Sequence, residues 1–186
     1  MNTATMRRVD RRLGRPLARL LTGWRRVADR FRRPDDGPPR KILVLKLAEH
    51  GVWVVAYSAL MDAIEMVGAD HVYVMTFSDN RFVLDQLGIL PPENIIEVPT
   101  SGTVGTLRNL VRAVRRVRRE QIDSVVDFEF FARSSAVIAY LTGATRRVGF
   151  HPVAEEADYR GDLMTHRLSF NSHLHAGQTF RTLVRA

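Results

Sequence analysis

Short apolar runs alternate with amphipathic segments along most of this chain. The first run, Ile42 to Leu45 and then Leu47, follows a Pro-Pro pair and ends at polar residues. An apolar run of this length with β-branched members is typical of a strand buried on both faces of a sheet. Similar runs recur at 72–76, 95–98, 122–126 and 147–150. Because helical patterns separate them, the sequence predicts an α/β fold with a parallel sheet and right-handed crossovers.

Helical periodicity accounts for the segments between and after these runs. We expect helices over residues 53–67, 80–87, 103–119, 134–141 and 172–185. The stretch from 151 to 170 is expected to be irregular and polar. In the first helix, the residues near helical spacing are Val54, Val55, Ala59, Ala63 and Met66.

The helix expected at 103–119 has the clearest two-sided pattern. Its apolar stripe consists of Leu107, Leu110, Val111, Val114 and Val117. A second face carries Arg108, Arg112, Arg115, Arg116 and Arg119. An arginine face of this kind is either simply solvated or in contact with an anionic acceptor or with membrane phosphates.

The net charge of the chain comes entirely from its first forty residues. Residues 1–40 hold twelve Arg and four Asp, whereas residues 41–186 hold sixteen Lys and Arg against sixteen Asp and Glu. The formal charge of +8 therefore describes an N-terminal tail and not the folded domain. For that reason the sequence disfavours nucleic acid as a partner.

Residues 1–33 form an arginine-rich segment whose apolar residues, from Leu13 to Phe31, recur at roughly helical spacing. Pro16 fits the first turn of such a helix. A basic amphipathic helix with Trp, Leu and Phe is typical of a segment on an anionic membrane surface, so we expect residues 13–33 to bind there. The alternatives are a solvated arm or a helix packed on a partner or on the domain. Residues 34–40 form a Pro/Gly linker, and the domain covers 41–186.

Several chemistries are excluded or disfavoured. The chain has no cysteine, which excludes disulfides and thiolate metal sites. It also lacks an apolar run of about 18 residues and an apolar secretory signal. Phosphate-loop and dinucleotide fingerprints are missing, because Gly51 stands alone. His173 and His175 would diverge on a helix, so no metal site is expected.

The first group of candidate residues follows the first strand. In an open α/β sheet, ligands bind beyond the carboxyl ends of the strands, which places residues 48–53 at a ligand-facing edge. Glu49 and His50 are the titratable groups there, and either could deprotonate a hydroxyl or simply cap the turn. Gly51 provides a backbone that turns sharply and lets a ligand approach.

The second group follows the fourth strand. Asp127 and Glu129, with Arg133 beyond, could bind sugar hydroxyls or act as bases; equally, Asp127 could cap the next helix and Glu129 could pair with Arg133. A third group, which includes Arg160 and His166, is dense in donors and acceptors. It could hold a polar ligand or form a loop that satisfies its own hydrogen bonds.

These residues bear a family resemblance. The run Lys41–Leu47, a turn ending in Gly51, and Ala56–Leu60 resemble the opening of glycosyltransferase family nine, the heptosyltransferase-like enzymes. Residues 125–136 are similar to that family's fourth strand and its helix, and residues 141–150 to its glycine-alanine, arginine, glycine-phenylalanine pattern. The match is extended by residues 159–167 and 171–175.

The resemblance implies a GT-B architecture, in which two Rossmann-like halves with helices on both faces of their sheets enclose the active site. The N-terminal half of such an enzyme binds the acceptor, typically a lipid-linked saccharide of the bacterial envelope. The C-terminal half binds the nucleotide-sugar donor. We expect this chain to be the acceptor half, with the donor-binding half missing or supplied by a partner domain. The resemblance also implies inverting, metal-independent transfer with no cofactor beyond the nucleotide-sugar, at the cytoplasmic face of the membrane.

One departure from the family pattern affects catalysis. The family's turn has Asp directly after Gly as the expected base, whereas here Val52 follows Gly51. Either Glu49, His50 or Glu129 has taken over as the catalytic base, or catalysis is lost. In the second case the chain is a non-catalytic binding or scaffold module on a membrane or in a larger assembly. The expected substrate-binding residues are Gly51, Asp127, Arg133, Arg160 and His166.

Overall fold

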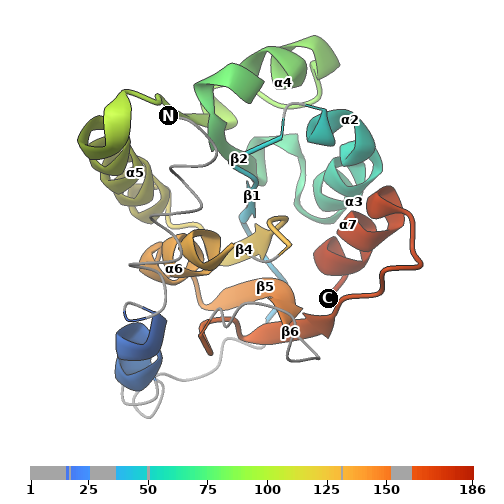
Figure 1. Cartoon of the computed structure of the whole chain (residues 1–186). Helices are drawn as coiled ribbons and strands as arrows, with labels where there is room; N and C mark the ends of the chain where they lie inside the picture. Colours follow the sequence, from blue (N-terminus) through green and yellow to red (C-terminus); the bar gives the residue numbers. More distant parts are fainter. Residues whose placement is uncertain (1–15, 17, 26–36, 50, 131, 152–160) are drawn as a thin grey trace.

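The computed structural model describes residues 16, 18–25, 37–49, 51–130, 132–151 and 161–186 (Figure 1). They form a six-stranded sheet in the order β3-β2-β1-β4-β5-β6, and every neighbouring pair is parallel. The strands are β1 (Ile42–Leu45), β2 (Val72–Phe77), β3 (Ile95–Val98), β4 (Ser124–Asp127), β5 (Arg146–His151) and β6 (His166–Ser169). The expected Rossmann-like α/β fold is confirmed.

Helices cover both faces of this sheet (Figure 1). They are α2 (Val52–Val55), α3 (Tyr57–Val67), α4 (Arg81–Leu87), α5 (Gly102–Arg119), α6 (Arg133–Leu141) and α7 (Ala176–Val184). Short 3-10 turns precede β2, α4 and β3, at Ala69–His71, Ser78–Asn80 and Pro92–Asn94. In the part of the chain described here, no helix is both long enough and apolar enough to cross a membrane.

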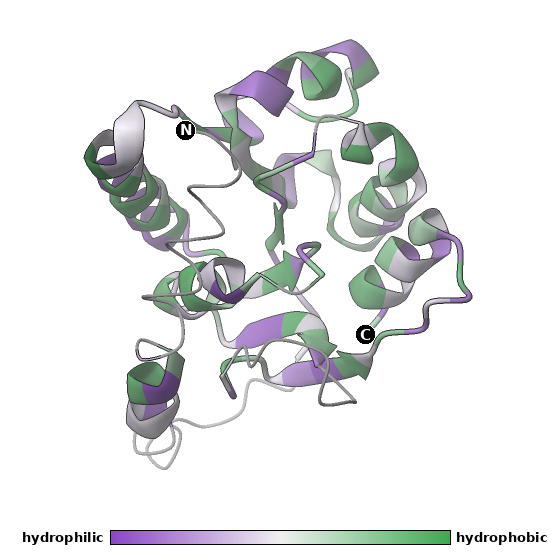
Figure 2. Ribbon diagram, viewed as in Figure 1, coloured by the Kyte–Doolittle hydropathy of each residue, from purple (hydrophilic) through white to green (hydrophobic). Residues whose placement is uncertain are grey.

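Alternate residues of the strands point to two separate cores. Ile42 and Val44 of β1 pack with α2, α3, α4 and α7 on one face of the sheet, whereas Leu43 and Leu45 pack with α5 and α6 on the other. Figure 2 shows the inner strands as largely hydrophobic, whereas β5 and β6 carry hydrophilic segments. Burial on both faces explains why the strands appear in the sequence as continuous apolar runs.

The position of the first helix was predicted correctly, but its buried face was predicted only in part. The predicted Ala59 and Ala63 are fully buried, together with Trp53 and Leu60, whereas the predicted Val54 and Met66 are exposed. The helix is divided at Ala56 into α2 and α3, although Ala56 still donates its backbone N–H to Val52 O at 2.8 Å. On this side of the sheet α7 packs against α3, and this proximity could not be known from local spacing.

The apolar stripe predicted for α5 is also only partly right. Val117 and Ala113 are buried and Val114 is partly buried, but Leu107 and Val111 are exposed. At about 100° per residue, Leu107 and Val111 lie well around the helix from the buried Thr106, Ala113 and Val117, so they project away from the core.

Two expectations about the C-terminal region were wrong. Residues 166–169, expected to be irregular, form β6, and α7 begins at Ala176 instead of 172. The edge strand β6 has partly exposed polar residues, so it lacks the apolar run that marks a buried strand. The side chain of His175 accepts a hydrogen bond from the backbone N–H of Gly177 and so caps α7.

The N-terminal helix, residues 18–25, packs on the domain. Asp162 donates its backbone N–H to Thr22 Oγ1 at 3.0 Å, and its Oδ1 forms an ion pair with Arg25 Nη1 at 3.0 Å. Gly161 has a φ of 76°, and a Cβ there would lie 3.1 Å from Ala18 Cβ. Packing on the domain was one of the alternatives that the sequence left open. The rest of the predicted amphipathic segment lies outside the described residues.

The link between α3 and α7 produces the first testable prediction. Arg181 and Arg185 both bind the buried Asp62 through two hydrogen bonds, at 2.7–3.1 Å. The hydrogen bond from Arg181 is the largest influence on Asp62 and lowers the pKa of its carboxyl group; burial opposes this shift and Arg185 adds to it. A lowered pKa in the folded state means that the stabilisation is present above the unfolded pKa, about 3.9, and disappears as the pH falls through the folded value.

We expect Asp62→Asn to lower the Tm at neutral pH by a few degrees, about 2–4 °C. The gap between variant and parent should close on acidification below about pH 4, because protonation removes the same charge from the parent. Thermal unfolding followed by circular dichroism at several pH values measures both effects. Asp85→Asn is the control, because Asp85 forms only an exposed pair with Arg81 on α4. A constant gap across this pH range would contradict the role assigned to Asp62.

Candidate functional site

The strand order fixes where the sheet can bind a ligand. Going outward from the centre, the chain proceeds through β1, β2 and β3 on one side and through β4, β5 and β6 on the other. Connections therefore leave β1 and β4 in opposite directions, and a crevice opens beyond their carboxyl ends. Leu45 and Asp127 are paired at this end, and Phe128 donates its N–H to Leu45 O at 2.9 Å. The segments after β1 and β4 therefore meet at the switch point.

A buried lysine joins these two segments. Lys46 is fully buried, and its Nζ lies 3.0 Å from Glu129 Oε2 and 2.9 Å from Glu49 Oε2. The ammonium also lies 5.9 Å from the centre of the Phe130 ring. A buried ammonium is strongly destabilising unless charges of opposite sign compensate it, and these two carboxylates do so. We call Lys46, Glu49, Asp127 and Glu129 the switch-point cluster.

Glu129 acts mainly as a clamp for the loop after β1. Its Oε1 accepts the backbone N–H groups of Leu47 and Ala48 at 3.0 and 3.1 Å, while Oε2 accepts from Lys46. From the other side, Asn80 Nδ2 donates to Leu47 O at 2.9 Å. With both oxygens engaged, Glu129 is better suited to hold the loop than to remove a proton from a substrate.

Asp127 stabilises the backbone at Glu129. Its buried carboxylate accepts the backbone N–H of Glu129 at 3.0 Å and the hydroxyl of Ser135 at 2.8 Å. The two structural alternatives weighed for this region are therefore wrong. Glu129 pairs with Lys46 instead of Arg133, and the N-cap residue of α6 is Ala132 instead of Asp127.

Glu49 is the exposed member of the cluster. Its side chain is 66% exposed, and its backbone has a φ of 76°. A residue with a Cβ seldom adopts this left-handed conformation, which costs of order 1 kcal/mol and is frequent at functional sites. By contrast, Gly51 has a φ of −84°, and a Cβ there would meet nothing within 4 Å. The conformational demand predicted for Gly51 falls on Glu49.

The other predicted residues lie in different places. Val52 begins α2 and packs partly against the apolar core beneath it. Arg133 is buried at the first position of α6, close in sequence to the end of β4. His166 begins β6, which β5 separates from β4, so it is not brought next to the switch-point cluster. His50 and Arg160 lie outside the described residues.

Lys46 and Asn80 were missed by the sequence analysis. Lys46 is the one charged residue within the first apolar run, and that position was the available signal. Asn80 carried no signal, because it was placed at the start of a helix and not beside Leu47. Among the residues that the structure describes, no group of three or more His, Asp or Glu is arranged to hold a metal ion.

The fold and the cluster define a Rossmann-like domain with a polar site at its switch point, and solved structures share this fold. E. coli heptosyltransferase WaaC with ADP-2-deoxy-2-fluoro heptose matches with a TM-score of 0.62 and 13% identity, over 77% of this chain and 47% of WaaC. A family 9 glycosyltransferase from Veillonella parvula DSM 2008 matches with a TM-score of 0.62 and 14% identity, over 78% of this chain and 40% of that chain.

These matches show that the chain shares its fold with a heptosyltransferase and a family 9 glycosyltransferase, in agreement with the sequence resemblance. The chain spans less than half the length of these solved transferases. No protein-family model matches the sequence, and no curated protein matches it.

The different roles of the two glutamates can be separated by stability measurements. We expect Glu129→Gln to lower the free energy of unfolding by about 2 kcal/mol, because it leaves the buried Lys46 with only an exposed partner. Glu49→Gln should cost less than about 0.5 kcal/mol, since its side chain is largely in water. Urea denaturation of both variants makes the comparison. Equal losses would contradict the assignment of Glu129 as the clamp.

Proposed function

We propose that this chain is the acceptor-binding half of a heptosyltransferase-like glycosyltransferase. It binds a lipid-linked saccharide of the bacterial envelope while a donor-binding half presents a nucleotide-sugar, which is a co-substrate and not a resident cofactor. Because the chain spans less than half the length of the solved transferases, the donor-binding half would come from further residues of the same polypeptide or from a partner chain.

The observation that carries this proposal is the switch-point cluster. Carboxylates at the carboxyl ends of β1 and β4 lie where open α/β sheets bind ligands, and they are acceptors suited to sugar hydroxyls. Lys46, Glu129 and Asn80 hold the loop in one conformation, so Glu49 is presented to solvent from a rigid support. Rigid presentation of this kind lowers the cost of orienting a bound acceptor.

Glu49 is the residue that we assign as the base. Its carboxylate takes the proton from an acceptor hydroxyl as the hydroxyl oxygen forms a bond to the anomeric carbon. The bond from that carbon to the nucleotide's phosphate oxygen breaks, and the nucleotide leaves with the electron pair. Attack from the face opposite the leaving group inverts the anomeric centre. Glu129 is a poorer base, because both of its carboxylate oxygens already accept hydrogen bonds from the loop after β1. His50 remains a second candidate.

The same proposal places the chain on the cytoplasmic face of a membrane, where a lipid-linked acceptor would be available. The support is the arginine-rich sequence of residues 13–33. Within the described helix 18–25, Leu20 and Trp24 point away from the domain and are each 71% exposed. Apolar side chains beside arginines suit attachment to an anionic interface.

A non-catalytic binding or scaffold module is the second candidate function. Val52 favours it, because this apolar residue occupies the position at which the family resemblance leads us to expect the base. In that case the switch-point cluster would bind a saccharide or a partner without transferring a sugar.

Sugar transfer by the polypeptide together with a donor-binding half tests the proposal. With nucleotide-sugar donors and an envelope lipid extract, we expect transfer by the parent and a loss of about 10²–10⁴-fold in kcat for Glu49→Gln. Glu49→Gly should lose transfer equally while keeping or raising the Tm, because glycine tolerates a φ of 76° best. Glu65→Gln, at an exposed position of α3, is the matched control, and this variant should transfer sugar normally.

Two results would count against this account. Normal transfer by both Glu49 variants would move the base elsewhere, with His50 the next residue to replace. Absence of transfer by the parent, with saccharide binding retained, would leave the non-catalytic module.

A further inference from the structure

The outward surface of α5 carries apolar side chains that nothing in the described structure covers. Val104, Leu107 and Val111 are 81%, 62% and 43% exposed. At about 100° per residue, these three positions project from one stripe of the helix. Three exposed apolar residues in a row on one helix differ from the singly scattered ones that are normal on protein surfaces.

Arginines lie beside this stripe. α5 contains six Arg and no Asp or Glu in its 18 residues. Arg116 and Arg118 donate to the backbone oxygens of Glu93 and Leu141, so these two help to pack the helix on the domain. Four others, Arg108, Arg112, Arg115 and Arg119, are exposed, and in the described part of the chain no carboxylate forms an ion pair with them. We call these four arginines, together with Val104, Leu107 and Val111, the α5 face.

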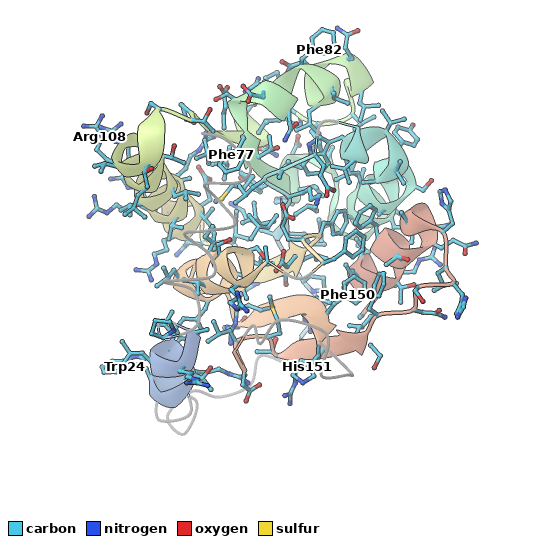
Figure 3. All side chains as sticks on the ribbon, viewed as in Figure 1. Trp24, Phe77, Phe82, Arg108, Phe150 and His151 are labelled. Atoms are coloured by element: carbon cyan, nitrogen blue, oxygen red, sulfur yellow. The ribbon has the colours of Figure 1, made fainter. Side chains whose placement is uncertain are left out.

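The α5 face and the N-terminal helix lie on the same side of the sheet. Leu110 and Val114 of α5 pack against the same core as Leu21 of the N-terminal helix. Figure 3 shows Arg108 and Trp24 on the same side of the view, away from Phe82 on α4. Figure 2 shows hydrophobic and hydrophilic residues alternating along α5. This side of the molecule therefore combines exposed apolar groups and arginines on two separate helices.

We propose that the α5 face is a docking surface for anionic lipid bilayers. Guanidinium groups bind lipid phosphates, and apolar side chains among them enter the boundary between headgroups and acyl chains. A nucleic acid or a uniformly acidic protein surface would pair with the arginines but would leave Val104 and Leu107 in water. An anionic bilayer matches the α5 face in both charge and hydrophobicity, and we therefore assign the bilayer as its partner.

Docking on this face would also orient the candidate site. α5 starts directly beyond the carboxyl end of β3, at the same edge of the sheet as the switch-point cluster. A bilayer in contact with the first turns of α5 would therefore lie near the edge at which the acceptor is proposed to bind. Docking on a bilayer does not require sugar transfer. Only the orientation of the candidate site toward the bilayer rests on the proposed function.

Vesicle binding by the full chain is the first test. We expect tight binding to mixed phosphatidylcholine–phosphatidylglycerol vesicles and little to pure phosphatidylcholine. Each arginine near an anionic surface contributes about fivefold to binding, so Arg108→Gln with Arg115→Gln should weaken it at least tenfold. The matched control, Arg40→Gln with Arg167→Gln, removes the same charge elsewhere and should change binding by no more than about threefold.

A labelled residue shows which face enters the membrane. Because the chain has no cysteine, Leu107→Cys can be labelled uniquely with a polarity-sensitive fluorophore. We expect its emission to shift to the blue on anionic vesicles, whereas a label at Val54→Cys, equally exposed on the opposite side of the sheet, should not shift. Circular dichroism confirms that both labelled chains are folded.

Three outcomes would overturn the inference. Vesicle binding without a shift at position 107 would assign attachment to the N-terminal segment alone. Equal losses in the two arginine pairs would show that binding depends only on net charge. Binding to RNA that leaves vesicles unbound would identify a nucleic-acid surface. Transfer measured with a detergent-solubilised acceptor would still report on the proposed function, so failure of one does not imply failure of the other.

Discussion

The placement of Lys46 is the constraint on which the candidate site depends. A fully buried ammonium at the end of a central strand must be compensated, and Glu129, after the neighbouring strand, is the partner that the fold supplies. The same carboxylate takes two backbone N–H groups of the loop after β1. One interaction therefore joins β1 to β4, fixes the loop and leaves Glu49 facing solvent.

The sequence was sufficient for most of the fold because its central strands are buried on both faces and so appear as uninterrupted apolar runs. It failed at β6, whose polar residues lie at the edge of the sheet, and at part of the buried face of the first helix, where Trp53 and Leu60 contact the core and Val54 does not. Both failures have one physical cause: the burial of these residues is decided by distant elements and not by local spacing.

The candidate site was predictable by residue type but not by pairing. Glu49, Asp127 and Glu129 could be identified because they follow strands. Their roles depend on contacts such as Lys46 with Glu129, 83 positions apart, and Asn80 with Leu47, 33 positions apart. Such contacts can be inferred only once the order of the parallel strands is known. The structure accordingly divides three similar carboxylates into a buried support, a clamp and an exposed group.

The central claim is that an acceptor saccharide binds at the switch point. Nuclear magnetic resonance of the isotope-labelled chain, titrated with a delipidated envelope saccharide, tests it most directly. The account predicts that the amide signals of Leu47, Ala48, Glu49 and Glu129 move together on titration, while that of His166 on the edge strand stays in place. Signal changes confined to residues remote from β1 and β4, with the signals of the loop after β1 unmoved at saturation, would contradict it.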